Sequence, residues 1–252
     1  MSHCVFALAS HPDDIEFMMG GTLLLLKERG CELHTMNLAN GNCGTTEYSS
    51  EEIIAIRRSE ARNAASFLEA EFHESLVNDL EIFYTDELIR KVTTIIRRVK
   101  PDIMLVQSPE DYMEDHMTAA RIAVTAAFCR GMPNYHSIPS VDPTMQDVVI
   151  YHALPYGLQD GLRRVINAEF YVDITPVIEN KERMLAFHQS QKRWLDESQG
   201  LDSYLKTMRE MSAEVGRMSG LGYAFAEGWR RHSHLGFSAP DSDPLRALLG
   251  AG

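Results

Sequence analysis

Polar residues that could carry out chemistry follow three strand-like apolar segments, at residues 4–9, 32–38 and 103–107. They are His11-Pro12-Asp13-Asp14, Asn40-Gly41, and the segment 110–116, which ends in Asp115-His116. In an open α/β sheet, ligands bind beyond the carboxyl ends of the strands, where the strand order reverses. We therefore expect these three segments to meet at one edge of a sheet, although they are far apart in the chain.

Histidine and carboxylate side chains at such an edge suggest a metal site. Imidazole and carboxylate groups are ligands that Zn²⁺ prefers, and a catalytic zinc site has three protein ligands and an open position for water. A further carboxylate beside the ion could act as general base on that water. The residues alone leave another interpretation open, because a His-Pro-Asp-Asp tetrapeptide is more often a turn in which proline fixes φ and aspartate caps a helix.

The order of the elements favours an α/β fold. Strands are predicted at 4–9, 32–38, 72–76, 103–107, 148–153 and 170–174, and helices at 22–29, 50–69, 86–99 and 115–129, with a mainly helical region up to 218. This alternation predicts a mostly parallel sheet flanked by helices, with a helical C-terminal part. We expect a single domain over residues 1–237 and a loose tail over 238–252, which is rich in Pro, Asp, Ala and Gly.

Composition narrows the class of partner. The formal net charge is −12, from 36 acidic and 24 basic residues, and an acidic surface repels nucleic acid. The four cysteines form no C-x-x-C pair, as is typical of proteins in a reducing cytosol. We find no signal peptide and no apolar run long enough to span a bilayer. These features predict a cytoplasmic protein with neither nucleic acid nor a membrane as its partner.

A longer series of motifs extends from the first of these segments. It comprises Ala9-Ser10-His11-Pro12-Asp13-Asp14-Ile15-Glu16, Gly20-Gly21-Thr22-Leu23, Asn40-Gly41, Arg57-x-x-Glu60-x-x-x-Ala64-Ala65, Asp115-His116, Lys181 through Leu185, His188-Gln189-Ser190-Gln191 and Ala226-Glu227-Gly228-Trp229. The series resembles the PIG-L / LmbE family of metal-dependent de-N-acetylases over most of residues 5–230. By this resemblance the fold is Rossmann-like, and the last three motifs belong to the final helices.

The resemblance also implies a site and a reaction. His11, Asp14 and His116 would hold Zn²⁺, or Fe²⁺ or another divalent first-row metal, and Asp13 would be the general base. The substrate would be a small N-acylated amino sugar or glycoconjugate, and the reaction hydrolysis of its N-acyl, typically N-acetyl, amide. Some family members cleave amides of thiol cofactors instead, and homo-oligomers are common in the family.

The chain departs from the family pattern at one position. The family commonly has His-Pro-Asp-His at the second motif, where the first histidine polarises the substrate carbonyl, whereas this chain has Met113-Glu114-Asp115-His116. A thioether cannot donate a hydrogen bond. Either catalysis relies more on the metal as Lewis acid, or another donor takes the place of that histidine. Tyr112 and His152 are the candidate donors, with Asp115 as the carboxylate that would orient His152.

Three further residues are candidates for contact with substrate. Arg57 could hold a substrate hydroxyl or the product carboxylate through its planar guanidinium, or could form an ion pair on a helix surface. Asn40 and Gly41 could shape the floor of a pocket, because glycine lets the backbone approach a ligand, or could form a plain turn. We expect substrate selectivity to arise from residues 42–49 and 131–145.

Three other classes of protein are also considered. A non-haem iron oxygenase would use a similar two-histidine, one-carboxylate set, but such sites commonly lie on β-barrels. A nucleotide-binding dehydrogenase would have G-x-G-x-x-G after the first strand, where this chain has His-Pro-Asp-Asp. A non-catalytic zinc- or sugar-binding module would not need Asp13.

Overall fold

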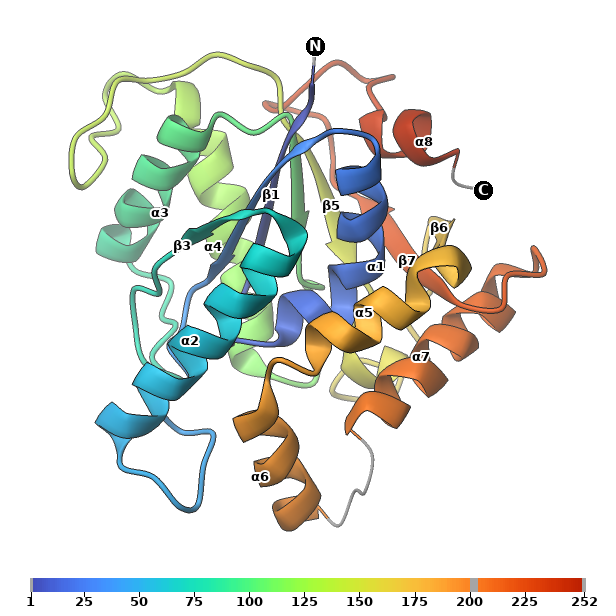
Figure 1. Ribbon diagram of the computed structural model, residues 1–252. Coiled ribbons are helices and arrows are strands. Elements are labelled where there is room, and N and C mark those ends of the chain that lie inside the picture. Colours follow the sequence, from blue (N-terminus) through green and yellow to red (C-terminus); the bar gives the residue numbers. More distant parts are fainter. Residues whose placement is uncertain (1, 200–203, 251–252) are drawn as a thin grey trace.

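Seven strands form one sheet in the computed structural model, which describes residues 2–199 and 204–250 (Figure 1). Their order in the sheet is β3-β2-β1-β4-β5-β7-β6. The bounds are β1 Cys4–Ala9, β2 Glu32–Asn37, β3 Glu71–His73, β4 Ile103–Val106, β5 Val149–Ala153, β6 Phe170–Asp173 and β7 Ala226–Arg231. Strands β1 to β5 are parallel, and β7 is antiparallel to both β5 and β6. The predicted mostly parallel α/β fold is confirmed.

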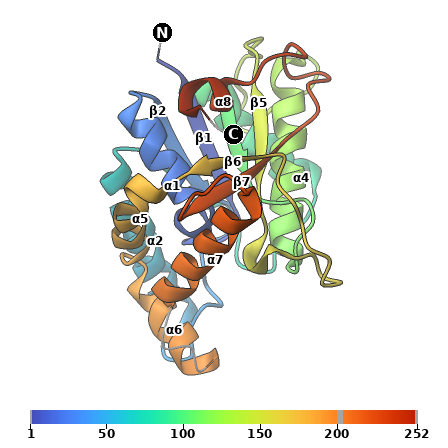
Figure 2. The ribbon, with the colours of Figure 1, turned by 90° about the vertical axis from the view of Figure 1, so that its right-hand side faces the viewer.

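Helices cover both faces of the sheet. Figure 2 shows α1, α2 and α5 on one side and α4 on the other; α3 packs against α4. The bounds are α1 Asp14–Glu28, α2 Ser50–Leu68, α3 Asp86–Val99, α4 Glu114–Phe128, α5 Ile178–Leu185, α6 Gln189–Gln199, α7 Tyr204–Ser219 and α8 Pro244–Leu249. Among the described residues, no helix combines the length and the hydropathy needed to cross a bilayer.

The central strand β1 is apolar along its whole length because both of its faces are covered. Val5 and Ala7 belong to the core beneath α1, α2 and α5, whereas Phe6 and Leu8 belong to the core beneath α3 and α4. Local signals determine where the helices begin. Ser49, for example, forms a reciprocal capping box with Glu52 at the start of α2.

The first helix begins earlier than the sequence indicates, at Asp14 instead of Thr22. Two adjacent glycines, Gly20 and Gly21, lie inside it, and their presence is explained by close packing. A Cβ atom on Gly21 would lie 2.6 Å from Ile174 Cγ2, and one on Gly20 would lie 2.5 Å from Met184 Cε. Glycine here lets α1 approach α5 and the end of β6, so the weak helix propensity of the pair is outweighed by packing.

Residues 226–229, which were expected in a helix, form strand β7 instead. This segment pairs with β5 on one side and β6 on the other, and the Trp229 side chain is fully buried. The expectation of a loose tail over 238–252 is also wrong for residues 244–249, which form α8. Leu245 of α8 is buried in the core, and the Tyr151 hydroxyl donates to Asp243 Oδ1 at 2.7 Å. Residues 251–252 lie outside the described part of the chain.

A buried carboxylate from β7 is inserted into the middle of α1. The two oxygens of Glu227 accept hydrogen bonds from the backbone N–H groups of Gly21 and Thr22, each at 2.8 Å. Lys181 Nζ lies 2.7 Å from Glu227 Oε1 and is equally buried. A side chain that enters the hydrogen-bond ladder of a helix bends it, and Figure 1 shows α1 changing direction along its length. The Glu227–Lys181 pair therefore joins α1, α5 and β7.

Replacing Glu227 with glutamine removes the charge that balances Lys181. We expect Glu227→Gln to lower the free energy of unfolding by about 3–5 kcal/mol, because it leaves a buried ammonium group without its counter-charge. Urea unfolding followed by circular dichroism measures the change. Glu110→Gln is the matched control, since Glu110 pairs with Arg230 on the exposed surface, and it should change the same quantity by less than about 1 kcal/mol. Equal effects of the two substitutions would contradict this prediction.

Candidate active site

Strands β1 and β4 lie side by side at the centre of the sheet, and the strand order reverses between them. The backbone N–H and the hydroxyl of Ser10, just after β1, both donate to Gln107 Oε1, just after β4, at 2.8 and 2.7 Å. Asn37, at the end of β2, donates from its side chain to the carbonyl of His11 at 2.6 Å. The carboxyl ends of the three strands are thus fixed to one another, as the fold rule for open α/β sheets predicts.

His11, Asp14 and His116 meet at this edge. One ligand atom from each lies within 4.8 Å of the others. His11 comes from the turn after β1, Asp14 is the first residue of α1, and His116 lies in the first turn of α4. Two buried imidazoles and one partly buried carboxylate form a donor set suited to a divalent transition metal.

A second carboxylate lies against the far side of each imidazole ring. His11 Nε2 lies 3.0 Å from Asp115 Oδ2, and His116 Nδ1 lies 3.1 Å from Asp111 Oδ1. The remaining nitrogens, His11 Nδ1 and His116 Nε2, lie 3.4 and 3.5 Å from the two oxygens of Asp14. Carboxylates placed in this way orient the rings of metal-binding histidines and make the inner nitrogen more basic.

The charges at this centre are strongly coupled. Burial lowers the pKa of His11, but the hydrogen bonds to Asp115 and Asp14 outweigh burial and raise it to about 10. Burial raises the pKa of Asp14, but His116 and His11 outweigh that effect and hold it well below its usual range. Asp14 is therefore ionised at neutral pH, which is the form that binds a cation.

Asp13 adopts an unfavourable backbone conformation next to this centre. Its φ of 111° lies in the left-handed region, which is strained for a residue with a Cβ atom. Its buried carboxylate accepts a hydrogen bond from the Tyr204 hydroxyl and lies 3.4 Å from Arg57 Nη2. Burial raises its pKa, an effect that Arg57 opposes, to about 6. Asp13 is thus a carboxylate that can gain and lose a proton near neutral pH.

Arg57 lines the cavity at this site, but its guanidinium contacts the protein. Nη2 donates to the carbonyl of Pro12 at 2.6 Å, and Nη1 donates to the carbonyl of Gly41 at 3.4 Å. Gly41 has a φ of 82°, and a Cβ atom there would lie 2.5 Å from Arg57 Cδ. Neither Gly41 nor Asn40 lines the cavity, and Asn40 donates to Asn78 Oδ1 instead. These residues support the loops around the site.

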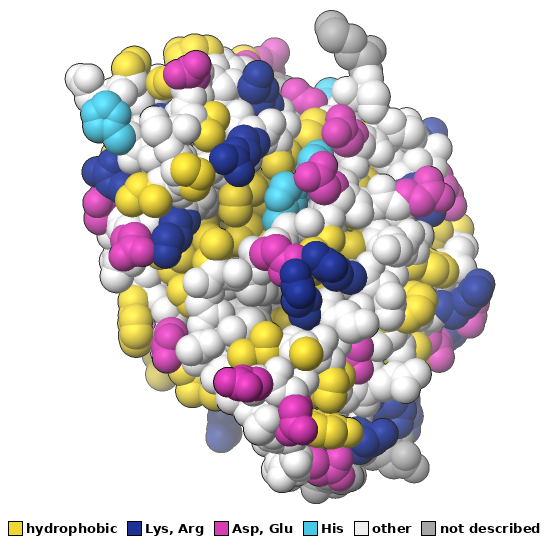
Figure 3. All heavy atoms as spheres, turned by 60° about the vertical axis from the view of Figure 1, so that its left-hand side comes forward, with side chains coloured by type: hydrophobic (Ala, Val, Ile, Leu, Met, Phe, Trp, Pro, Cys, Tyr) yellow, Lys and Arg dark blue, Asp and Glu magenta, His cyan; other side chains and the backbone are white. Residues whose placement is uncertain are grey.

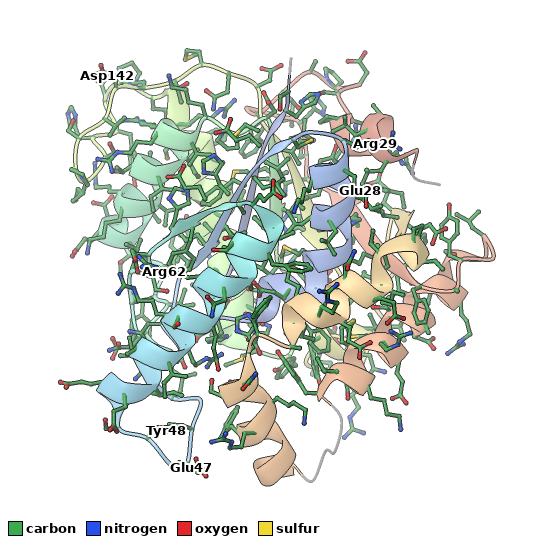
Figure 4. The ribbon with its side chains drawn as sticks, in the orientation of Figure 1. Glu28, Arg29, Glu47, Tyr48, Arg62 and Asp142 are labelled. Atoms are coloured by element: carbon green, nitrogen blue, oxygen red, sulfur yellow. The ribbon has the colours of Figure 1, made fainter. Side chains whose placement is uncertain are left out.

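A cavity of about 590 Å³ opens in front of the cluster. Its walls include the aromatic side chains of Phe17, Tyr112, Tyr156, Trp194 and Tyr204. Further residues come from the loop after β2 (Cys43, Gly44) and from α6 (Gln191). Figure 4 labels Glu47 and Tyr48 at the tip of that loop, near α6, where Arg193 Nη1 donates to the Tyr48 hydroxyl at 3.3 Å. None of residues 131–145, all of which are described, lines this cavity.

Of the two residues expected to polarise the substrate carbonyl, Tyr112 lines the cavity and His152 does not. The Tyr112 ring lines the cavity, is 57% exposed, and packs edge-on against His116 with 5.7 Å between the ring centroids. His152 does not line the cavity; its Nδ1 lies 2.8 Å from the carbonyl oxygen of Gln107 and its Nε2 lies 3.0 Å from His232 Nδ1. Asp115 contacts His11 and not His152. The expectation for His152 is thus not supported by its position.

Sequence reasoning missed several residues that shape this site. Asp111 carries a usable signal, because it lies five positions before His116, in the loop that leads into α4. Asp79 accepts from the backbone N–H groups of Gly41 and Cys43 at 2.7 and 3.1 Å. Tyr204, on α7, carries no signal, since nothing in the sequence relates it to Asp13, which lies 191 residues earlier.

A family model and a curated relative that match this chain both describe deacetylases. The family model described as "PIG-L: GlcNAc-PI de-N-acetylase" matches residues 6–127. The diacetylchitobiose deacetylase of Thermococcus kodakarensis is 30% identical over 242 residues, covering 90% of this chain and 82% of that protein.

Several solved structures share the fold, among them a deacetylase and a hydratase. The N,N'-diacetylchitobiose deacetylase of Pyrococcus horikoshii has a TM-score of 0.76 against this chain and is 24% identical to it. The match covers 96% of this chain and 88% of that one. The 4-carboxy-2-hydroxymuconate hydratase of Pseudomonas putida has a TM-score of 0.74 with 20% identity, covering 92% and 96%. Because a deacetylase and a hydratase share this fold, the fold alone does not select the reaction.

The hydrogen bonds of Arg57 generate a stability prediction. Arg57→Met leaves the carbonyl of Pro12 without its charged donor, so we expect the free energy of unfolding to fall by about 2–3 kcal/mol in a urea titration. Arg58→Met is the matched control on the same helix. Arg58 is exposed, and its partner Glu74 keeps a contact with Arg62, so we expect little change. A loss with Arg57→Met no larger than with Arg58→Met would refute the supporting role.

Proposed function

This chain belongs to the PIG-L family of deacetylases, and from that starting point we propose that it hydrolyses the N-acyl amide of a small amino sugar or glycoconjugate. The observation that carries the proposal is the placement of Asp13 beside the His11–Asp14–His116 cluster, in a cavity with aromatic walls. The relative that matches 90% of this chain is a diacetylchitobiose deacetylase, which makes N-acetylated glucosamine units the first substrates to test.

We infer that His11, Asp14 and His116 hold Zn²⁺; Fe²⁺ or another first-row divalent ion would use the same donors. The donor set fits, because both imidazoles are oriented by carboxylates and Asp14 is ionised. When bound, such an ion polarises the amide carbonyl and lowers the pKa of the attacking water.

Asp13 is the residue that we assign to proton transfer. Its carboxylate accepts the proton of the water that attacks the amide carbon, and it then donates that proton to the departing amine nitrogen. A pKa of about 6 suits both steps near neutral pH. The Tyr204 hydroxyl and Arg57 fix the orientation of the carboxylate, so both act as positioning residues.

Tyr112 is the residue that we assign to the developing oxyanion. Met113 lines the cavity but has no proton to donate, whereas the adjacent Tyr112 carries a hydroxyl on a ring held between His116 and Tyr156. Partial desolvation of that hydroxyl inside the cavity, together with the nearby carboxylates of Asp14 and Asp111, raises its pKa above the usual value, so it remains a hydrogen-bond donor at neutral pH.

The remaining cavity wall suits a sugar. Aromatic rings such as Phe17, Tyr156 and Trp194 offer flat apolar faces. Gln191 also lines the cavity, and a side-chain amide can exchange hydrogen bonds with sugar hydroxyls.

Release of acetate tests the reaction directly. We expect the zinc-loaded protein to release acetate from N,N'-diacetylchitobiose or a related N-acetylglucosamine conjugate, and chelation to abolish the activity. Asp13→Asn should lower kcat by about 10²–10⁴-fold, the usual contribution of a general base, with its metal content unchanged. Near-native turnover by metal-loaded Asp13→Asn would refute the role of Asp13.

The same assay separates the other candidate functions. Activity only on amides of thiol cofactors would change the substrate class while keeping the reaction. Binding of zinc and sugar without release of acetate from any substrate would favour a non-catalytic module.

Tyr112 is tested by removing its hydroxyl. Tyr112→Phe should lower kcat by about 10²-fold or more, as loss of one oxyanion donor does. Tyr84→Phe, which is outside the cavity, is the control and should leave kcat unchanged. Adding Met113→His to Tyr112→Phe should restore part of the activity, because it supplies a donor at the neighbouring position. Unchanged kcat in Tyr112→Phe would eliminate this hydroxyl as the donor.

A further inference from the structure

A second group of histidine and carboxylate side chains lies at the β2–β3 edge of the sheet. His34 pairs with Glu71 across the two strands, and His73 follows two residues after Glu71. Glu32 lies two residues before His34 on β2. Because side chains two residues apart in a strand point to the same face, all four lie on the face that carries α3 and α4. Figure 3 shows histidine side chains beside acidic ones on this side of the molecule.

The atoms of this group are spaced as metal ligands are. His34 Nδ1 lies 3.0 Å from His73 Nε2 and 3.6 Å from Glu71 Oε2, and the three ligand atoms lie within 4.8 Å of one another. With Zn–N bonds of about 2.0–2.1 Å, two ligands of a tetrahedral zinc ion lie about 3.3 Å apart. The His34–His73 and His34–Glu71 separations, 3.0 and 3.6 Å, lie on either side of that value. Small movements of these side chains would therefore fit them around an ion.

Glu32, the fourth residue of the group, lies against the His34 ring as Asp115 lies against the His11 ring. His34 Nε2, the ring nitrogen that faces away from His73, lies 3.4 Å from Glu32 Oε1. This repeats the arrangement of Asp115 on His11, in which a carboxylate orients the ring and makes its inner nitrogen more basic.

The group is separate from the candidate active site. His34 lies three residues before the end of β2, or about 10 Å along the strand at a rise of 3.3 Å per residue. None of His34, Glu71 and His73 lines the cavity of the candidate active site. The side chain of His34 is 5% exposed, while that of Glu71 is 67% exposed, so the group is anchored in the fold and open to solvent on one side.

We propose that His34, His73 and Glu71 form a second site for a divalent transition metal such as Zn²⁺, with Glu32 orienting His34. Two imidazoles and one carboxylate leave a fourth position for water. Strand β3 has only three residues at the edge of the sheet, and an ion bridging β2 and β3 would fasten it. The site is independent of the proposed function, because it shares no residue with the cluster at His11.

Cys4 is a rival ligand, since Cys4, Glu32 and His34 also lie within reach of one ion. The thiol is unsuited to the role. Its Sγ donates to the carbonyl of Val99 at 3.5 Å, and burial together with the nearby carboxylates of Glu32 and Asp102 raises its pKa to about 12. A metal binds the thiolate, which this environment disfavours.

Zinc stoichiometry tests the proposal. The purified full-length chain is loaded with Zn²⁺, freed of excess by gel filtration and measured by atomic emission. We expect two ions per chain in the native protein, one in Glu71→Gln/His73→Gln, one in His11→Gln/His116→Gln and none when all four residues are replaced. One ion in the native protein together with none in His11→Gln/His116→Gln would overturn the proposal, and would leave His34 and His73 as a hydrogen-bonded pair.

Thermal unfolding provides an independent measurement in the His11→Gln/His116→Gln background. Zinc at about 100 times its Kd should raise Tm by about 5 °C or more, and adding Glu71→Gln should remove the shift. Glu32→Gln should weaken binding by about 10–100-fold, whereas Cys4→Ala should leave it unchanged. Loss of binding in Cys4→Ala with retention in Glu71→Gln would refute the ligand set. His136→Gln, remote from both groups, controls for the loss of a surface histidine.

Discussion

The site depends above all on the turn that joins β1 to α1. This turn carries the strained Asp13 between His11 and Asp14, and a strained residue persists only when its surroundings hold it in place. Asn37 holds the carbonyl of His11, and Arg57 holds the carbonyl of Pro12. If this turn relaxed, the proposed general base and two of the three proposed ligands would move together. The hydrogen bonds from neighbouring loops are therefore as necessary to the site as the residues within it.

Electrostatic compensation explains how so many charged groups are buried near one another. Each charged or titratable group at the site has a counterpart: Asp14 lies between two imidazoles, His11 lies against Asp115, and Asp13 lies near Arg57. Further away, Glu227 combines the same compensation with a structural role, because its carboxylate satisfies Lys181 and two backbone N–H groups of α1. Burying such groups is tolerable because they are paired and hydrogen-bonded.

Much of this arrangement could be predicted from the sequence, and the failures have physical reasons. The six strands named from apolar runs are all present. The pattern is clearest for central strands such as β4 and β5, every residue of which is buried. Residues 226–229 were expected in a helix, and their strand forms only because β5 and β6 offer partners on either side. Similarly, α1 runs through Gly20 and Gly21 because packing against α5 outweighs their low helix propensity.

The sequence by itself determined the fold class and the segments whose polar residues meet at the carboxyl edge of the sheet, since these follow from local pattern and from the geometry of parallel strands. Only the tertiary structure decided which side chains act on which. It placed Tyr112 in the cavity and His152 against His232. It also gave Asp13 its partner Tyr204, from the far end of the chain. Contacts of this kind depend on side-chain direction and on how distant elements pack, and no local pattern in the chain encodes them.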